Sequence, residues 1–127
     1  MYVNDNSNPE EKRVGDCVIR ALAEVLGQTW ERIYIELCLM GLIMADLPNA
    51  NQVWGAYLRS KGYRRDRIPG EAGEYTVEDF CRENPKGRYI LAIDQHVVAV
   101  IDGQYVDSWD SGQAKPIFYW HREEREE

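Results

Sequence analysis

The dipeptide Asp102-Gly103 constrains the fold of this chain more than any other feature. It separates two runs rich in branched and aromatic residues, 96–101 and 104–109. Asp-Gly between two such runs is a strong signal for a β-hairpin closed by a two-residue turn. The sequence therefore predicts two antiparallel strands, over 96–101 and 104–109, that pair in one register.

The predicted register gathers an imidazole, a carboxylate and an indole on one face of the hairpin. Counted back from the turn, His96 faces Trp109, and Asp107 lies diagonally across from His96 at a backbone separation of roughly 7–8 Å. Side chains alternate between the two faces along a strand, so Asp110 falls on the opposite face. Asp107 is therefore the predicted partner of the His96 imidazole.

A cysteine in the first quarter of the chain supplies a candidate nucleophile. Cys17 opens a segment whose apolar residues recur at helical spacing up to Leu26. The free N–H groups and the dipole at a helix N-terminus stabilise a thiolate, and a nearby imidazolium lowers the thiol pKa further. A hydrogen-bonded carboxylate holds such an imidazole in one orientation. We therefore predict Cys17 as the nucleophile, His96 as base and acid, and Asp107 as the orienting group.

Other polar residues and cysteines receive structural interpretations. Asp16 is interpreted as the N-cap of the first helix. Arg20, one turn further on, is interpreted either as a partner in a structural salt bridge or as a cap of a loop carbonyl. Cys38 and Cys81 lie in apolar helical stripes and are assigned to the core. His121 neighbours the charged tail and is expected to be exposed.

The order of the three candidate residues resembles that of the papain-like cysteine peptidases. In that superfamily a cysteine at a helix start is followed by a histidine on one strand and by Asn or Asp on the next, often within an Asn-Ser-Trp string. The corresponding residues here are Cys17, His96 and Asp107-Ser108-Trp109. The family's tryptophan shields the contact between the histidine and its orienting residue, so the resemblance implies that Trp109 is the shield.

More narrowly, the chain looks like the compact papain-like proteins encoded by bacteriophages and prophages. The segments that carry this resemblance are Asn8-Pro9, 15–21 and 107–112. This resemblance spans most of the chain. It implies an α+β, papain-like fold in which N-terminal helices pack on a C-terminal antiparallel sheet. It also implies a cysteine peptidase that cleaves a peptide or isopeptide bond, with a protein or peptide as substrate and without a metal or organic cofactor.

The chain departs from the larger peptidases at the oxyanion site. They place a glutamine about six residues before the nucleophile, where this chain has Glu11. The backbone N–H of Cys17 can still donate to an oxyanion. Among side chains, Asn4, Asn6 and Asn8 are candidates for the second donor, and Asn8 is preferred. The short chain also leaves out most of a substrate-binding lobe, so the family does not indicate the substrate.

Two alternative functions use the same fold. Transglutaminases, arylamine acyltransferases and cell-wall amidases have similar triads, and the fate of the thioester would separate an acyltransferase or amidase from a peptidase. The other alternative is a non-catalytic module that binds a host protein while Cys17 stays idle. The presence of Glu11 and the missing lobe favour this second alternative.

Charge and hydropathy argue against other kinds of partner. The chain has 15 Lys and Arg against 22 Asp and Glu, a net charge of −7, which disfavours nucleic acid as the main ligand. No apolar run approaches the roughly 20 residues of a membrane span, and the polar first residues do not resemble a signal peptide. We therefore expect no membrane partner and a cytoplasmic location, in the host cell if the chain is phage-encoded. No metal-ligand spacing such as CxxC occurs, and the oligomeric state is left open.

One domain is expected over residues 1–127, with an irregular segment over 1–14 and an acidic tail over 122–127. The second predicted helix, which starts at Trp30, ends before Gly41. Asn51 caps the third predicted helix, which runs to Lys61. Apolar periodicity and stop signals predict helices over 17–26, 30–40, 51–61 and 77–83, the last with a capping box that begins at Thr76. Besides the hairpin, strands are predicted over 63–68, 89–93 and 117–120.

Overall fold

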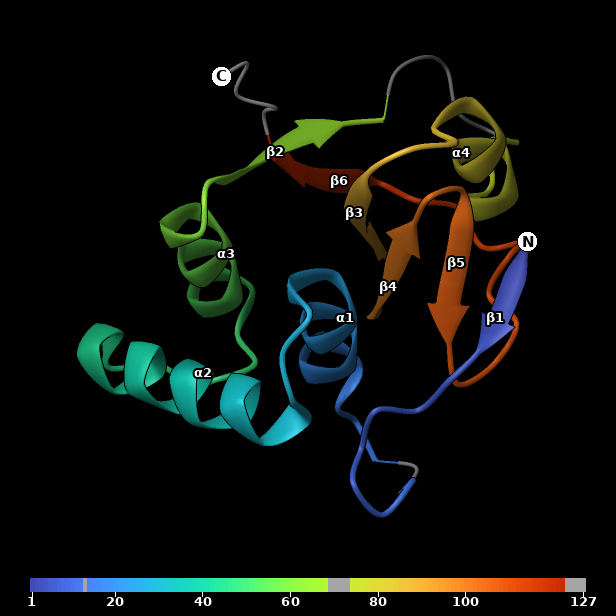
Figure 1. The fold of residues 1–127 in the computed structure, drawn as a ribbon. Coiled ribbons are helices and arrows are strands. Elements are labelled where there is room, and N and C mark those ends of the chain that lie inside the picture. The colour runs from blue at the N-terminus through green and yellow to red at the C-terminus, as the bar shows by residue number, and fades with distance from the viewer. Residues whose placement is uncertain (13, 69–73, 123–127) are drawn as a thin grey trace, which may run out of the picture.

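The computed structural model describes residues 1–12, 14–68 and 74–122. The acidic tail beyond Arg122 therefore lies outside the described residues. Within them, four helices and six strands follow one another along the chain (Figure 1). Their order is β1 (Tyr2–Asn4), α1 (Cys17–Leu26), α2 (Trp30–Met44), α3 (Asn51–Ser60), β2 (Tyr63–Arg67), α4 (Val77–Glu83), β3 (Arg88–Ile93), β4 (His96–Ile101), β5 (Gln104–Asp107) and β6 (Phe118–Arg122).

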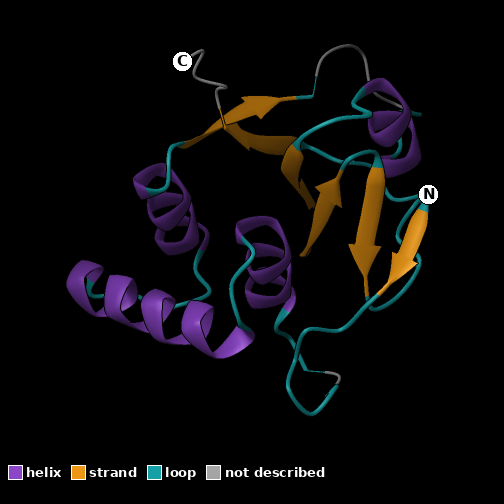
Figure 2. Ribbon diagram, in the orientation of Figure 1, coloured by secondary structure: helices purple, strands orange, loops and turns teal. Residues whose placement is uncertain are grey.

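The strands form one sheet in the order β1-β5-β4-β3-β6-β2, with helices packed against both faces (Figure 2). Ile90 and Ala99 point to the face that α1 and α3 cover, and α2 packs against these two helices. Their chain neighbours Leu91 and Val98 point to the other face, where they pack with Phe80 of α4. This alternation follows from the pleat of the strands. The predicted α+β class is thus confirmed. Besides the N-terminal helices on one face, α4 covers the other face of the sheet.

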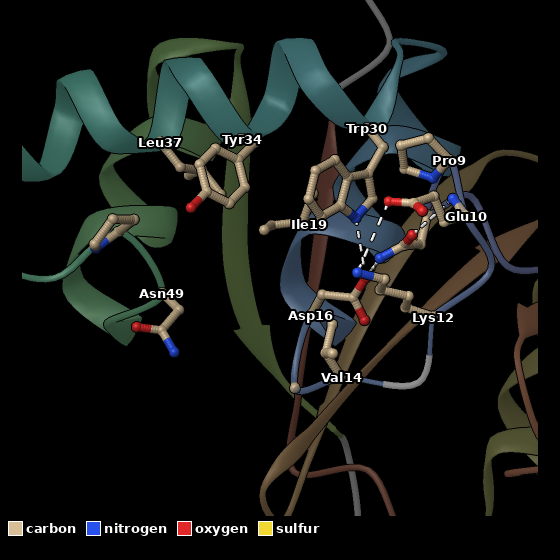
Figure 3. A pocket seen from close by; sticks show the side chains of 13 residues that line it. Pro9, Glu10, Lys12, Val14, Asp16, Ile19, Trp30, Tyr34, Leu37 and Asn49 are labelled. Carbon is tan, nitrogen blue, oxygen red and sulfur yellow. Dashed lines mark hydrogen bonds and ion pairs between the residues drawn. The ribbon is translucent and has the colours of Figure 1, made fainter.

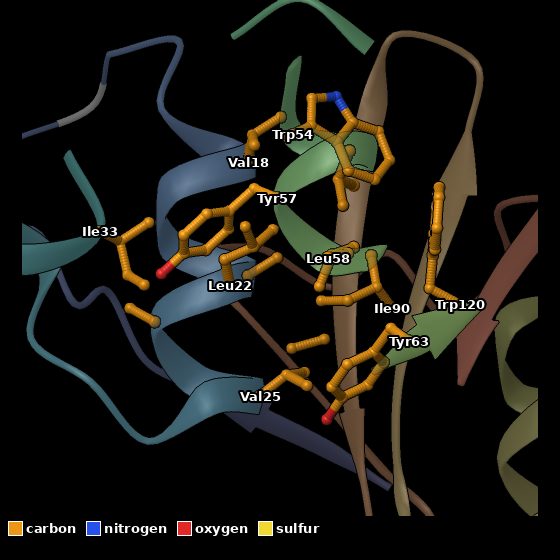
Figure 4. Packing of buried hydrophobic residues seen from close by; sticks show 14 of the residues in the cluster. Val18, Leu22, Val25, Ile33, Trp54, Tyr57, Leu58, Tyr63, Ile90 and Trp120 are labelled. Carbon is orange, nitrogen blue, oxygen red and sulfur yellow. The ribbon is translucent and has the colours of Figure 1, made fainter. Parts of the chain in front are cut away.

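The larger core lies between α1, α3 and the sheet. Leu22 and Leu58 are fully buried there and meet Ile90 of β3. The rings of Trp54 and Trp120 add to the same cluster, with centroids 5.8 Å apart (Figure 4). Because α1 is held by this core along its whole length, its N-terminal residue has a defined position relative to β4.

The hairpin pairs in the predicted register. Ile101 lies opposite Gln104, Val100 opposite Tyr105 and Ala99 opposite Val106. The prediction of a strand up to residue 109 is wrong, because β5 ends at Asp107. The N–H that follows Asp107 donates to the Asp107 side chain at 2.8 Å and leaves the strand ladder.

The sheet is mixed, so the predictions of an antiparallel sheet and of an irregular segment over 1–14 are wrong in part. Tyr2–Asn4 forms β1 and pairs parallel with β5, with Tyr2 opposite Tyr105 and Asn4 opposite Asp107. This pairing covers the backbone edge that β5 would otherwise expose, which is a usual way to protect an edge strand. The N-terminal strand therefore braces the strand that carries Asp107.

Two predicted helix ends are also wrong. Helix α2 runs past Gly41 to Met44 and ends at Ala45 in the left-handed conformation. Gly41 stays helical and allows close packing, since a Cβ there would lie 2.8 Å from the carbonyl oxygen of Asp46. Helix α3 begins at Asn51, but Ala50 occupies the cap position. The bounds of α1 and the capping box of α4 are as predicted.

Candidate active site

The three predicted catalytic side chains meet at one end of the sheet. Cys17 is the first residue of α1, His96 the first residue of β4 and Asp107 the last residue of β5. The Nε2 atom of His96 lies 2.6 Å from Oδ2 of Asp107. Cys17 and His96 line the same cavity, and the imidazole lowers the pKa of the Cys17 thiol. Since Asp107 engages Nε2, the Nδ1 atom is the ring nitrogen left for the thiol.

The electrostatics favour a charged pair of Cys17 and His96. Burial alone would raise the pKa of the Cys17 thiol, but hydrogen bonds from His96 and from the Val97 backbone, with the charges of His96 and Arg20, outweigh it and lower that pKa. Burial likewise opposes the imidazolium, yet hydrogen bonds and charges from Asp107 and Cys17 raise the pKa of His96 to about 9. A thiolate beside an imidazolium is the form of a cysteine nucleophile that reacts.

Asp107 is a buried carboxylate whose oxygens are well satisfied. Only 3% of the residue is exposed. Besides His96, its donors are the Ser111 hydroxyl at 2.9 Å, the Ser108 N–H at 2.8 Å and the Arg20 guanidinium at 3.2 Å. Burial raises its pKa, but these hydrogen bonds and the His96 charge prevail, so the pKa of Asp107 is lowered. The side chain is therefore held ionised and in one orientation.

Asp16 has a different role from the N-cap interpretation. It occupies the cap position of α1, but its side chain makes no capping hydrogen bond. Its oxygens accept instead from Arg20 Nε at 2.8 Å and from Asn8 Nδ2 at 3.2 Å. They also accept from Trp30 Nε1 at 2.9 Å (Figure 3). Only 5% of Asp16 is exposed. These partners come from three parts of the chain, so Asp16 joins α1 to α2 and to the N-terminal loop.

Arg20 links this cluster to the triad. Its guanidinium donates to Asp16 through Nε and to Asp107 and Ser108 through one terminal nitrogen. The predicted structural salt bridge of Arg20 is thus present, and it has two carboxylate partners. The spacing of Asp16 and Arg20, four residues apart on one helix, is the signal from which the first of these contacts could have been predicted. The contact with Asp107 has no such local signal.

The preferred oxyanion donor does not contact the candidate site. Asn8 is buried, its Nδ2 donates to Asp16, and its Oδ1 accepts from the N–H of Glu10 at 3.0 Å. It does not line the cavity that Cys17 and His96 share. The structure gives Asn8 a supporting contact to Asp16, and its role as oxyanion donor stays a prediction.

A cavity of about 320 Å³ opens in front of the thiol. Trp109 lines it, about half exposed, with its ring centroid 4.8 Å from that of His96. The side chains of Lys12 and Gln95 also line it. Gln95 has a left-handed φ of 56° in the turn before β4. Lys12 and Gln95 are thus among the side chains with donor groups that line this cavity, together with Arg20, Ser108 and Trp109.

His121 and the remaining cysteines lie elsewhere. The expectation that His121 is exposed is wrong, because its ring is half-buried against β2 and its Nε2 lies 2.5 Å from Oδ2 of Asp66. Cys81 is buried as predicted, and burial raises the pKa of its thiol to about 11. Cys38 is partly buried. The thiol at the start of α1 is therefore the one cysteine that the described residues bring to an imidazole.

Comparison of the chain with protein-family models, curated proteins and solved structures found no match. Among the described residues, no group of three or more His, Cys, Asp or Glu side chains is arranged to hold a metal ion. No helix in the described part of the chain has the length and apolar character needed to cross a membrane.

Proposed function

We propose that this protein is a cysteine peptidase of papain-like fold, which cleaves a peptide or isopeptide bond through Cys17, His96 and Asp107. The observation that carries the proposal is the shared imidazole: His96 lies 2.6 Å from Asp107 and lines one cavity with Cys17, the first residue of α1, whose thiol pKa it lowers. Each of the three side chains then has the neighbour that nucleophilic catalysis by a thiol requires.

In the first half of the reaction, the Cys17 thiolate attacks the substrate carbonyl carbon. A C–S bond forms, and the π electrons of the carbonyl move to its oxygen. The Cys17 N–H donates to this oxyanion, which lies at the helix N-terminus where negative charge is favoured. When the oxyanion collapses, the C–N bond breaks and the His96 imidazolium gives its proton to the leaving amine. A thioester on Cys17 and a neutral imidazole remain.

In the second half, His96 accepts a proton from water as the water oxygen attacks the thioester. The tetrahedral intermediate collapses, the C–S bond breaks and the carboxylic acid product departs. The sulfur leaves as a thiolate beside the imidazolium, so the starting state is restored. Asp107 keeps the imidazole oriented throughout, and its buried hydrogen bonds prevent it from rotating away.

A second candidate, the non-catalytic binding module, is favoured by the outer surface of α2. Leu39, Leu42 and Ile43 are 55%, 77% and 80% exposed and lie within a turn and a half of one helix. A contiguous apolar surface of this kind is typical of a site that binds another protein. An acyltransferase or amidase would use the same triad as the peptidase, and the acceptor of its acyl group would distinguish it.

The test is the rate at which iodoacetamide alkylates each cysteine at pH 7, measured by mass spectrometry of tryptic peptides. We expect Cys17 to react faster than Cys38 and Cys81, and His96→Ala to remove the advantage. His121→Ala is the matched control, since it removes the other histidine of the chain and should leave the Cys17 rate unchanged. Equal rates for the three cysteines, or a Cys17 rate that His96→Ala does not alter, would overturn the proposal.

A further inference from the structure

The side of α2 that faces away from the core is largely apolar. The buried residues of this helix are Ile33, Leu37 and Gly41. Ile35 and Leu39 follow Ile33 and Leu37 by two positions, which corresponds to a rotation of about 200° on an α-helix. They therefore point away from the core, and they are 59% and 55% exposed. Figure 1 shows α2 at the edge of the molecule, with α1 and α3 beside it.

The apolar surface continues to the C-terminal end of the helix. Leu42 is 77% exposed and Ile43 is 80% exposed. Between Glu36 and Asp46 the sequence has no charged residue, so this half of α2 is apolar on its outer side as well as on its inner side. A helix that is apolar all round is typically buried, and depletion of charge is typical of the centre of a protein interface. This surface, which we call the outer face of α2, comprises Ile35, Leu39, Leu42 and Ile43.

The two ends of the outer face differ in charge. Arg32, the third residue of α2, has a side chain that is 63% exposed, and its Nε donates to Glu36 at 2.8 Å. Glu31, the other charge of this turn, is compensated by the positive end of the helix dipole. The C-terminal end carries the negative end of the dipole and the exposed Asp46, and the last turn of α2 has no basic side chain. A cation from another molecule would therefore be stabilised at this end.

A second copy of the chain, placed antiparallel, complements this face. A two-fold axis that passes through Leu39, perpendicular to the helix, brings Leu39 against its own counterpart. It also places Ile35 level with Ile43 of the second copy, since both lie four positions from Leu39. The same rotation brings Arg32 to the C-terminal end of the other helix, where the negative end of the dipole lies. A parallel pair would instead bring like ends together, so the apolar contacts and the charges favour the same arrangement.

We propose that the outer face of α2 binds a second copy of this chain, so that two antiparallel α2 helices form the interface of a two-fold symmetric dimer. One closed contact of this kind covers the same apolar side chains on both copies, and two-fold symmetry is by far the commonest in soluble homo-oligomers. The occupant differs from the host protein of the second candidate function. The inference does not rest on the proposed peptidase activity.

The size of the outer face sets the expected affinity. Helix α2 has 15 residues, so it is about 22 Å long and, with its side chains, about 10 Å across. A standard interface buries about 800 Å² on each partner, which is more than one face of such a helix provides. The dimer should therefore be weak, with a dissociation constant of about 10–100 µM. Well below this concentration the protein is expected to be a monomer.

The first test is sedimentation velocity at pH 7, from about a tenth to about ten times the expected dissociation constant. We expect the dimer fraction to rise with concentration. Leu42→Lys should raise the dissociation constant about tenfold or more, because it places a charge in the apolar centre. A lysine near a helix C-terminus suits the helix dipole, so the monomer should stay folded, as circular dichroism checks. Ile117→Lys, the same change at a side chain outside α2 that is 51% exposed, is the matched control and should leave the dissociation constant unchanged.

A cross-linking test determines the orientation of the two helices. In a Cys38→Ser background, Leu39→Cys should give a disulfide-linked dimer under mild oxidation, because the two copies of this position meet at the axis. Ile35→Cys in the same background should not, since its two copies would lie about 12 Å apart along antiparallel helices. Disulfides form only where the Cα atoms lie within about 7 Å of each other. In a parallel pair, both variants would cross-link.

Three results would overturn the proposal. The first is a protein that stays monomeric over the whole concentration range. The second is a dimer that Leu42→Lys leaves intact, because association would then use another surface. The third is cross-linking of Ile35→Cys as readily as of Leu39→Cys. None of these results depends on the reactivity of Cys17, so the dimer proposal and the peptidase proposal fail independently.

Discussion

Arg20→Met is the most informative single change to the site, because it removes a buried cation that two buried carboxylates share. The Arg20 side chain is 11% exposed, and those of Asp16 and Asp107 are 4% and 2% exposed. Its Nε lies 2.8 Å from Asp16, and a terminal nitrogen lies 3.2 Å from Asp107. Methionine fills much of the same volume, so the change removes charge and hydrogen bonds while it keeps most of the packing.

The expected loss in the free energy of unfolding depends on how well the two carboxylates remain paired once Arg20 is removed. Removing one partner of a buried ion pair costs about 3–5 kcal/mol, since the other charge stays buried without compensation. Here each carboxylate keeps other donors, Trp30 and Asn8 for Asp16, and Ser108 and Ser111 for Asp107. The free energy of unfolding should therefore fall by an amount near the lower limit, about 3 kcal/mol at pH 7.

The chain contains a matched control on its surface. Arg32 Nε lies 2.8 Å from the Glu36 carboxylate, the same distance and the same four-residue spacing as Arg20 and Asp16. The Arg32 side chain, however, is 63% exposed. An exposed helical ion pair contributes about 0.3–0.5 kcal/mol, so Arg32→Met should cost no more than that. The two variants differ in burial and in the number of carboxylate partners, which is two for Arg20 and one for Arg32.

The assay is urea unfolding at pH 7, followed by tryptophan fluorescence, with free energies taken from linear extrapolation. The double variant Asp16→Asn with Arg20→Met should recover part of the loss, because it removes one of the two unpaired charges. If Arg20→Met costs no more than Arg32→Met, burial does not decide the strength of these pairs, and the argument for a buried charge cluster is refuted.

Four further predictions concern pH, core packing and backbone proximity. Folding lowers the pKa values of Asp16 and Asp107, so their ionised forms stabilise the fold above about pH 4, and this contribution is lost as the pH falls through the folded pKa values. The difference in stability between Arg20→Met and the unmodified protein, measured by thermal melts, should therefore shrink below about pH 4. The lowered pKa of Cys17 predicts that alkylation by iodoacetamide persists below about pH 8, where an ordinary thiol slows, and a pH–rate profile with a midpoint near 8.5 would contradict this. In α2, Ile33→Ala should cost about 2–5 kcal/mol because Ile33 is fully buried, whereas Ile35→Ala should cost less than about 0.5 kcal/mol in the same urea assay. Gly41→Ala should destabilise the protein despite the better helix propensity of alanine, since the added Cβ meets a backbone carbonyl at 2.8 Å; a higher melting temperature would contradict this.

The parts of the site that the sequence predicts are those that local rules determine. A two-residue turn and a strand period of two place Asp107 with His96, and both rules act within fourteen residues of chain. The helix that starts at Cys17 is likewise readable from apolar spacing and from the glycine that ends it. That Cys17 reaches His96 depends on packing between α1 and β4, which no local rule determines. At the sequence level, only the chemistry of the three residue types and the resemblance to papain-like peptidases indicate it.

The missed features depend on long-range partners. β1 has three residues and pairs parallel with β5 about a hundred positions away. No turn signal and no periodicity in the sequence therefore predicts this strand. Asp16 has the residue type and position of an N-cap, and propensity alone predicts that role. In the folded chain Trp30, Asn8 and Arg20 offer its carboxylate stronger, buried donors, so tertiary contacts override the local preference.

A buried cluster of one cation and two anions is a poor way to gain stability, because well-packed apolar side chains of similar volume often serve as well or better. Its value here is geometric. Asp16 immediately precedes the nucleophile, and Asp107 orients the imidazole, so Arg20 ties the residue beside the thiol to the residue that positions its base. Apolar contacts tolerate sliding, whereas a guanidinium that binds both carboxylates fixes their separation and direction. A site that needs its sulfur and imidazole within hydrogen-bonding distance gains from such a constraint even where the fold as a whole gains little.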